Sequence, residues 1–195
     1  MAAMKKFLII GNINANTHKE IFPLIKENKI WLGPSITGGN RRFDVPDDYP
    51  LNAATCGVDS DGVHFIRVKD ARWFTNLGHQ KRNAPIDLHK KYNADEYQKY
   101  DNYDAINVDK VKDIPVDYDG VMGVPITFLD KYCPSQFEII GCFNNFKECD
   151  YESGFICGSP IEYKLKSGEV RTYKSPFVNG VPKYKRILIK RKASV

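Results

Sequence analysis

The first 33 residues constrain the fold most strongly, because they hold two apolar segments with a helical pattern between them. The segment KKFLIIGN, residues 5–12, is an apolar run between lysines and Gly-Asn, which predicts a strand buried on both faces. Residues 16–29 carry apolar side chains at helical spacing, and Pro23 would either kink this helix or lie in its first turn. The segment KIWLG, residues 29–33, predicts a second strand. This order of elements predicts a right-handed parallel crossover.

Strand signals continue along the rest of the chain. Four segments carry the pattern of a regular element: strands over residues 62–77, 103–111 and 136–143, and a short helix over 126–133. Residues 33–62 are rich in Gly, Pro and Asp and predict a long loop, either functional or disordered. Turn signals at Ser167-Gly168 and Asn179-Gly180 predict hairpins in the tail. We therefore expect an α/β fold with C-terminal β-hairpins.

The composition is that of one globular domain. The chain has 195 residues, of which 42% are hydrophobic and 27% charged, so we expect a single domain over residues 1–195. The net charge of +5 is compatible with a nucleic-acid partner but does not require one. No segment has the pattern of a signal peptide or a membrane span, so we expect a cytoplasmic protein without membrane contact.

The five cysteines indicate neither a disulfide framework nor a zinc site. Their odd number and loose spacing are typical of reduced thiols in a cytoplasmic protein. Structural zinc sites usually contain close pairs such as C-x2-C, and no pair in this chain is that close. The aspartates between Asp101 and Asp119 follow no known ligand spacing, so a solvated acidic face is the expected explanation. We therefore expect no metal.

Basic side chains lie beside rings or polar amides in three segments: residues 41–43, 70–83 and 183–192. Lys and Arg neutralise phosphates, Asn reads adenine edges and rings stack on unpaired bases, so the first two segments predict DNA contacts. The alternative is that Trp73 and Phe74 are core residues and the charges only solubilise the chain. In the third segment Ile187 and Ile189 share one face of a strand, which favours a structural role. The predicted DNA-binding residues are Arg41, Arg42, Arg72, Asn76, Lys81 and Arg82.

Six phrases occur in order between about Lys5 and Lys192: KKFLIIGN, KEIFPLIKENKIWLG, RWFTNL, KYDNYDAINVDKVKDIP, DGVMGVPITFLDKYCPSQFEIIG and YKRILIKRK. Together they resemble the EcoRI-type adenine-specific DNA methyltransferases. The resemblance implies transfer of a methyl group from S-adenosylmethionine to the N6 of adenine in duplex DNA, as part of a restriction-modification system. It also implies a seven-stranded, mostly parallel sheet, of which this chain would form a partial methyltransferase (Rossmann-like) sheet.

The resemblance covers the C-terminal portion of such an enzyme. The family holds the target amine with an Asn-Pro-Pro-aromatic motif that would precede residues 5–12, and this chain has no Pro-Pro dipeptide. The cofactor segments of the family also precede this point, so we assign no catalytic residue and leave the cofactor-binding residues unknown. The strand at Phe7 to Ile10 would then be an inner strand with an open edge. We expect an N-terminal partner chain, a second copy of this chain or a local rearrangement to cover it.

Three interpretations of the function remain open. The chain is a methyltransferase portion that works with a missing N-terminal half, a non-catalytic DNA-binding module, or an inactive remnant of such an enzyme. The first two expect double-stranded DNA as a partner. Gly120, Gly123 and Pro125 either shape a tight backbone passage into the next helix or line the pocket for the target base or cofactor.

Overall fold

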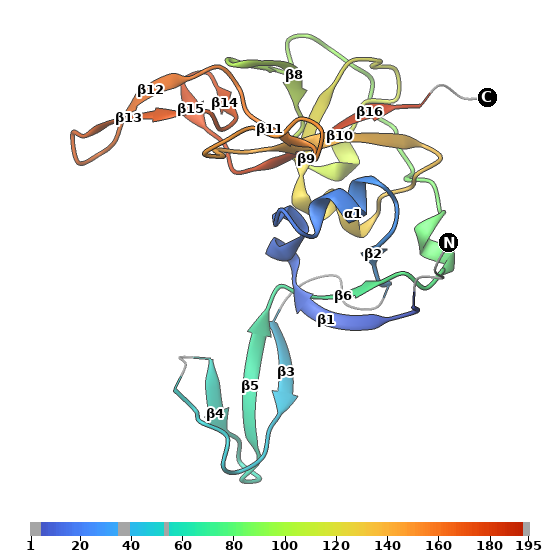
Figure 1. The fold of residues 1–195 in the computed structure, drawn as a ribbon, viewed down its shortest axis with the longest axis vertical. Coiled ribbons are helices and arrows are strands. Elements are labelled where there is room, and N and C mark those ends of the chain that lie inside the picture. The colour runs from blue at the N-terminus through green and yellow to red at the C-terminus, as the bar shows by residue number, and fades with distance from the viewer. Residues whose placement is uncertain (1–4, 35–39, 53–54, 193–195) are drawn as a thin grey trace.

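The structure is a computed structural model that describes residues 5–34, 40–52 and 55–192. Most of the regular structure in these residues is β-strand (Figure 1). The described part of the chain has one α-helix, α1 (Phe22–Lys26), and no described helix could cross a membrane. Four 3₁₀ turns accompany it: η1 (Ile13–Thr17), η2 (Gln80–Arg82), η3 (Val111–Asp113) and η4 (Ile126–Asp130). The α/β expectation is therefore confirmed only in part, because strands and hairpins greatly outweigh helix.

The helix predicted over residues 16–29 is shorter than expected. Pro23 lies in the first turn of α1, as the sequence suggested, because a helix does not need the N–H group that proline lacks there. Asn28 then adopts a left-handed conformation with φ of 58°, which ends the helical segment. The helix predicted over residues 126–133 is likewise a single 3₁₀ turn, η4.

The two strands of the predicted strand–helix–strand unit belong to one three-stranded sheet, and a later strand, β6, lies between them. The sheet order is β1-β6-β2, and β6 runs antiparallel to both neighbours. The strands are β1 (Leu8–Asn12), β2 (Trp31–Leu32) and β6 (Ala71–Thr75). β1 and β2 are thus parallel to each other, as predicted, but they are not adjacent. β6 takes the central position because four of its five residues are buried, which suits a strand paired on both edges.

β1 forms the edge of this sheet and is exposed. Leu8, Ile9 and Ile10 are 54%, 58% and 43% exposed, so the prediction that this strand is buried on both faces is wrong for the described structure. Among the described residues only β6 pairs with β1, and the other edge of β1 is open. An apolar strand with an open edge is a template for pairing with another strand.

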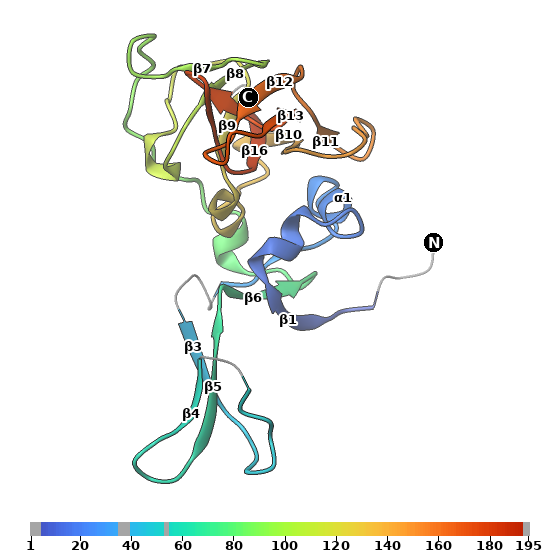
Figure 2. The same cartoon turned by 90° about the vertical axis from the view of Figure 1, so that its left-hand side faces the viewer.

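A second three-stranded sheet projects from the body as an arm (Figures 1 and 2). It has the order β3-β5-β4 and is antiparallel throughout. Its strands are β3 (Asn40–Asp44), β4 (Cys56–Val58) and β5 (His64–Lys69). The predicted loop over residues 33–62 therefore contains two strands. The single strand predicted over 62–77 is divided at Asp70, whose φ of 58° turns the chain from the arm into β6.

The largest sheet is mixed and six-stranded, with the order β11-β10-β16-β9-β8-β7. Its strands are β7 (Lys99–Tyr100), β8 (Tyr103–Asn107), β9 (Met122–Pro125), β10 (Phe137–Phe143), β11 (Phe155–Ile156) and β16 (Arg186–Arg191). The strands predicted over 103–111 and 136–143 are confirmed as β8 and β10. β16 lies near the centre, where Ile187, Leu188 and Ile189 are fully buried. This burial confirms a structural role for the basic tail.

The two hairpins predicted in the tail are confirmed. They are formed by β12 (Ile161–Lys164) with β13 (Val170–Tyr173), and by β14 (Phe177–Val178) with β15 (Val181–Pro182). The second turn has two left-handed residues, Asn179 with φ of 52° and Gly180 with φ of 73°, as primed hairpin turns require. The Asp101 carboxylate accepts both of their backbone N–H groups, at 3.0 and 2.8 Å.

One apolar core joins the β1-β6-β2 sheet to the six-stranded sheet. Phe22 of α1 and Phe74 of β6 belong to the same buried cluster as Ile106 of β8 and Phe137 of β10. The burial of Phe74 bears out its interpretation as a core residue. Leu188 belongs to a separate cluster, whereas its neighbours on β16 belong to the main one, so the central strand is packed on both faces.

The cysteines depart from expectation. Cys149 and Cys157 form a disulfide with a Cα–Cα distance of 5.7 Å, which corrects the prediction of reduced thiols at these two positions. Gly154 brings them together, because its φ of 85° turns the chain back between them. Burial raises the pKa of the Cys142 thiol to about 12, so this side chain is an inert part of the core.

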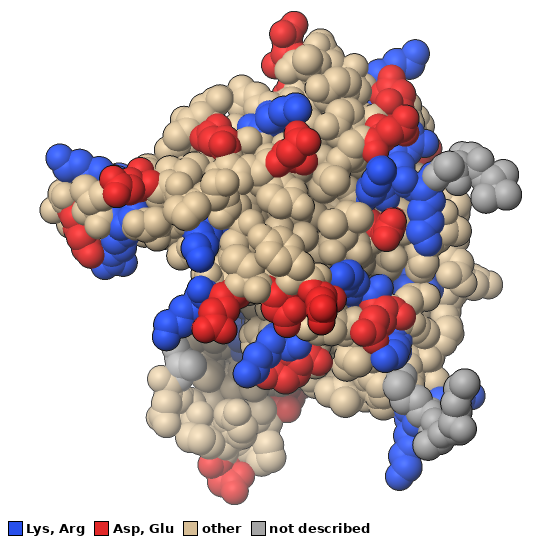
Figure 3. All heavy atoms as spheres, turned by 45° about the horizontal axis from the view of Figure 1, so that its top comes forward, with Lys and Arg blue, Asp and Glu red and all other residues tan. Residues whose placement is uncertain are grey.

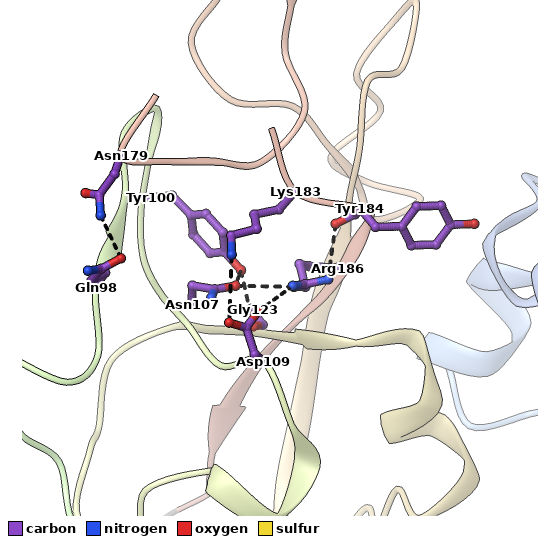
Figure 4. A network of polar contacts seen from close by, with 9 residues as sticks. All are labelled: Gln98, Tyr100, Asn107, Asp109, Gly123, Asn179, Lys183, Tyr184 and Arg186. Carbon is purple, nitrogen blue, oxygen red and sulfur yellow. Dashed lines mark hydrogen bonds and ion pairs between the residues drawn. The ribbon is translucent and has the colours of Figure 1, made fainter. Parts of the chain in front are cut away.

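A polar network closes one end of the six-stranded sheet (Figure 4). The Arg186 guanidinium donates to Asp109 at 2.8 Å and to the Asn107 side chain at 3.3 Å. The Tyr100 hydroxyl donates to Asn107 at 3.0 Å and to the Gly123 carbonyl at 3.2 Å. A Cβ atom on Gly123 would overlap the Tyr100 ring, so glycine is required for this close approach. This packing favours the interpretation of Gly123 as part of a tight backbone passage.

We expect Asp109→Asn to lower the free energy of unfolding by about 1 kcal/mol at pH 7, a modest value because the Asp109 side chain is 58% exposed. Burial alone would raise the pKa of Asp109, but hydrogen bonding to Asn107 and the charges of Lys183 and Arg186 lower it below 3.8. A carboxylate whose pKa is lower in the folded state stabilises the fold above about pH 4 and loses this effect in more acidic solution. Urea denaturation of both proteins at several pH values should therefore converge below pH 4, and a constant difference would contradict this account.

Candidate nucleic-acid interface

The strand register of the arm places basic residues on both of its faces. Arg42 of β3 lies opposite Arg67 of β5, and Asn40 lies opposite Lys69 two residues further along. Residues paired in this way share a face, so Arg42, Arg67 and Lys69 form one basic face. Arg41 lies opposite Val68 on the other face. The arm therefore presents cations to solvent in two directions.

Arg42 is held in place by two carboxylates and a ring. Its Nε donates to Asp44 at 2.8 Å, its Nη2 donates to Asp59, and its guanidinium carbon lies 4.4 Å from the centre of the Phe65 ring. The bonds to Asp59 and Asp44 raise the pKa of Arg42, and the bond from Arg42 lowers the pKa of Asp59. Because both carboxylates neutralise Arg42 locally, its charge is less available to a ligand than that of its basic neighbours.

Arg72 lies in the interior. Its side chain is 3% exposed and forms two bonds to Asp130 of η4, from Nε at 2.7 Å and from Nη2 at 3.0 Å. A third bond joins Nη1 to the Ala71 carbonyl at 2.8 Å. These contacts tie β6 to η4 and leave little of the guanidinium for an external ligand.

Arg82 is also buried, and it bridges η2 to two other segments. It donates to the Tyr132 carbonyl at 2.9 Å and to the Asn28 side chain. Its guanidinium carbon lies 4.9 Å from the centre of the Tyr132 ring and 5.2 Å from that of Trp31. Burial lowers the pKa of Arg82, and Tyr132 and Cys133 partly oppose this effect. The Arg82 side chain therefore links η2 to the segments that contain Tyr132 and Asn28.

Asn76 and Lys81 complete the predicted set. Asn76 accepts the Phe7 N–H at 3.0 Å and donates to the Lys5 carbonyl at 2.9 Å, so it fixes the chain that enters β1. Lys81 is exposed and donates to the Pro34 carbonyl at 3.2 Å.

The six predicted residues therefore do not form a single surface. On the face drawn in Figure 3, basic and acidic side chains are interspersed. Arg41 and Arg42 lie on the arm, Lys81 lies on the surface of the body, and Arg72, Asn76 and Arg82 have bonding partners within the chain. Contact with DNA by any of them stays a prediction.

A polar cluster that the sequence did not indicate lies where β1 ends. The Asn12 side chain accepts the Asn14 N–H at 2.9 Å, and the Tyr184 hydroxyl donates to the Asn14 side chain at 3.2 Å. Lys185 donates to the Thr17 hydroxyl at 2.7 Å. Sequence inspection missed this cluster because its two parts are about 170 residues apart.

Tyr184 of this cluster and Asn16, which lies in η1 between Asn14 and Thr17, differ in exposure and in bonding. The Tyr184 ring is 61% exposed and points away from the network around Asp109 (Figure 4). Asn16 is fully buried, and both polar atoms of its side chain lack a partner among the described residues. Metal binding has no such support, because no three His, Cys, Asp or Glu side chains of residues 5–34, 40–52 and 55–192 are grouped to hold an ion.

Comparisons with known proteins identify the family. Residues 1–192 match the family described as adenine-specific methyltransferase EcoRI, and the chain belongs to that family. It is 54% identical over 138 residues to the type II methyltransferase M.EcoRI of Escherichia coli, covering 70% of this chain and 42% of that protein. It is 37% identical over 191 residues to the type II methyltransferase M.MgeORF184P of Mycoplasma genitalium, covering 96% of this chain and 57% of that protein.

A third relative extends the comparison. The type II methyltransferase M.MpnI of Mycoplasma pneumoniae is 35% identical over 195 residues, covering 98% of this chain and 58% of that protein. The chain thus spans about half the length of the curated relatives that it matches. No solved structure matches it.

The family implies S-adenosylmethionine, and the described residues at the end of β1 fit this cofactor incompletely. They offer the amides of Asn12 and Asn14 and the hydroxyls of Thr17 and Tyr184. A nucleoside cofactor is usually held through its ribose hydroxyls by a carboxylate, and the described residues of this cluster include none. No methyl-transfer step follows from these residues alone.

We expect Arg72→Met to lower the free energy of unfolding by about 3 kcal/mol, because it leaves the Asp130 carboxylate, 11% exposed, without its partner. The double variant Arg72→Met/Asp130→Leu should recover most of this loss. Urea denaturation measures both effects. Arg41→Met makes the same chemical change at an exposed position and should alter stability by less than about 0.5 kcal/mol. Equal losses in Arg72→Met and Arg41→Met would contradict the structural role of Arg72.

Proposed function

We propose that this chain is the DNA-binding and sheet-completing portion of an adenine-specific (N6) DNA methyltransferase of a restriction-modification system. The observation that carries the proposal is the family match over residues 1–192, combined with coverage of about half of each relative. S-adenosylmethionine supplies the methyl group when it is bound. The chain provides cationic surfaces for the duplex and the apolar edge to which the rest of the enzyme attaches.

The arm is the first proposed DNA contact. Among the described residues Arg41, Arg67 and Lys69 have no carboxylate partner, so their charges are available to phosphates. A narrow β-ribbon fits into the major groove of a duplex, where arginine pairs with guanine. Arg42 is oriented by Asp44 and Asp59 and would position the arm more than it would neutralise phosphates. Lys81 lies outside the arm and would contact the duplex from the body.

The open edge of β1 supports the second part of the proposal. β1 and β2 are parallel and lie on either side of β6, so a further strand beside β1 would extend the sheet into a larger, Rossmann-like one. Leu8, Ile9 and Ile10 are apolar and exposed on both faces of their strand, an arrangement that favours association with other elements. We propose that the remaining segments of a full-length enzyme cover this edge, and that a second copy of this chain does so when it is alone.

The cluster at the end of β1 would then lie at the border with those segments. Asn14 and Tyr184 are exposed there, next to the edge where the sheet would continue. The catalytic side chains and most of the cofactor pocket would come from the other side of this border. Residues of this chain would hold the duplex and shape one wall of the site.

We expect the isolated chain to bind duplex DNA in a salt-dependent manner but to show no saturable binding of S-adenosylmethionine. The reason is that its cations are exposed, whereas the cluster at the end of β1 provides only part of a cofactor site. Fluorescence titration with a labelled duplex and calorimetric titration with the cofactor measure the two properties. Methylation should appear only when a segment with an Asn-Pro-Pro-aromatic motif is added. One-to-one cofactor binding by the folded chain would contradict the proposed division of the site.

Two other results would favour the alternatives. DNA binding without methylation, even after the second segment is added, would indicate a non-catalytic DNA-binding module. Binding of neither DNA nor cofactor by a folded sample would indicate an inactive remnant.

We expect the isolated chain to self-associate through β1, and Leu8→Lys/Ile10→Lys to make it monomeric. Both side chains are about half exposed, so the substitutions should change the melting temperature by only a few degrees. Val170→Lys/Val181→Lys is a matched control, since these valines are similarly exposed on the hairpins. Sedimentation velocity across a range of concentrations measures association. A monomeric wild-type chain whose β1 amides are protected from hydrogen exchange would contradict pairing at this edge.

A further inference from the structure

We infer that a lysine-lined hollow between η2, η3 and η4 binds backbone phosphates of the DNA duplex, as a second contact beside the arm. The inference rests on the proposed function, which it makes more specific. The residues that line the hollow are Lys81, Lys110, Val111, Lys112, Thr127, Asp130 and Lys131. Lys110, Lys112 and Lys131 were not among the residues predicted from sequence.

The hollow has a strong excess of positive charge. Within the described residues none of its four lysines forms an ion pair, whereas Lys90 and Lys99 elsewhere are paired with Glu96 and Asp104. The only carboxylate in its lining is Asp130, which Arg72 already neutralises through two bonds. The buried ion pair therefore neutralises the carboxylate that lines this hollow and would otherwise compete for the lysines.

The contiguous hollow adds one more acidic residue. Asp87 lines it, together with Lys81, Lys112 and Lys131. Its side chain is 85% exposed and lies 3.2 Å from His89. A carboxylate this exposed is screened by water and offsets only part of the surrounding positive charge.

The backbone that carries these lysines is well anchored. In η3 the Asp113 N–H bonds the Lys110 carbonyl at 2.9 Å, and the following Ile114 is fully buried. In η4 the Lys131 N–H bonds the Phe128 carbonyl at 2.9 Å, and Phe128 is fully buried. The anchored turns therefore fix where the lysine side chains begin, while each flexible stem can adjust its ammonium group to a phosphate.

The hollow lies where one DNA duplex could contact both it and the arm. Lys81, at its border, donates to the carbonyl of Pro34, which precedes β3 in the chain. The hollow therefore lies beside Pro34, and the arm projects from the same body (Figure 2). A duplex that lies along the arm could also reach the hollow.

The number and kind of cations favour a nucleic-acid backbone over a small anion. Lysine is a compact, hydrated point charge on a flexible stem, which suits independent phosphates better than bidentate recognition of one ligand. Four such charges around an open hollow match a repeating line of phosphates. This binding would be independent of sequence, because phosphate contacts position a protein and base contacts specify the site.

The test is the triple variant Lys110→Gln/Lys112→Gln/Lys131→Gln, titrated with a labelled duplex at several salt concentrations. Each phosphate contact contributes a slope of about −0.9 to the dependence of log K on log salt concentration. The variant should reduce the steepness of this slope by roughly 2 to 3 and weaken binding on the order of 100-fold at about 0.1 M salt. The loss should be similar for duplexes of different sequence.

The matched control is Lys147→Gln/Lys164→Gln/Lys190→Gln, which removes the same charge from exposed lysines on three other segments. It should change affinity by less than about threefold, and circular dichroism should show that both variants are folded. Arg41→Glu serves as the comparison on the arm.

Equal effects of the two triple variants would overturn the inference, and if Arg41→Glu still weakened binding the proposed DNA-binding function would stand. A folded wild-type chain that does not bind the duplex would overturn both.

Discussion

The buried ion pair between Arg72 and Asp130 connects the β1-β6-β2 sheet to the turn η4 that follows β9 of the six-stranded sheet. Arg72 lies on β6, the central strand of the sheet that carries β1, and Asp130 lies at the end of η4, which follows a strand of the six-stranded sheet. Because both side chains are nearly buried, their charges are compensated only by each other and by neighbouring polar groups. The pair therefore fixes how β6 meets η4. It also removes the carboxylate charge from the lysine-lined hollow, so one interaction links the packing of the body to its surface electrostatics.

Two surfaces of the chain are exposed and have few partners among the described residues, and they differ in chemistry. The edge of β1 is apolar, lies beside a single strand among the described residues and adjoins polar side chains at its carboxyl end. The arm and the hollow are cationic and open to solvent. Apolar strand edges associate with protein, whereas cationic surfaces associate with phosphates. This separation agrees with a portion of a methyltransferase that would join other protein segments on one side and DNA on the other.

The sequence predicted individual elements well where the evidence was local. The hairpins at Gly168 and Gly180, the strand β10 and the first-turn position of Pro23 all follow from short-range rules of backbone conformation. The predictions from sequence were wrong or incomplete where the role of a residue depends on which distant segment packs against it. Arg72 and Arg82 looked like ligands of DNA because charge beside aromatic residues is ambiguous until the burial of the side chain is known. Lys110, Lys112 and Lys131 were overlooked because they meet Lys81, which the sequence did indicate, only in three dimensions.

The family and the turn chemistry could be recognised from the sequence, since both depend on the identity and order of neighbouring residues. The sequence could not determine which strand would lie beside β1, because the pairing of β6 with β1 and β2 joins segments that are about 40 to 70 residues apart. Nor could it determine which cations are available. Arg72 meets a carboxylate in the interior and Lys131 remains in water, yet each is a basic residue followed by an aromatic one in the sequence. Only the packing of distant segments distinguishes them, because burial and pairing are properties of the folded chain.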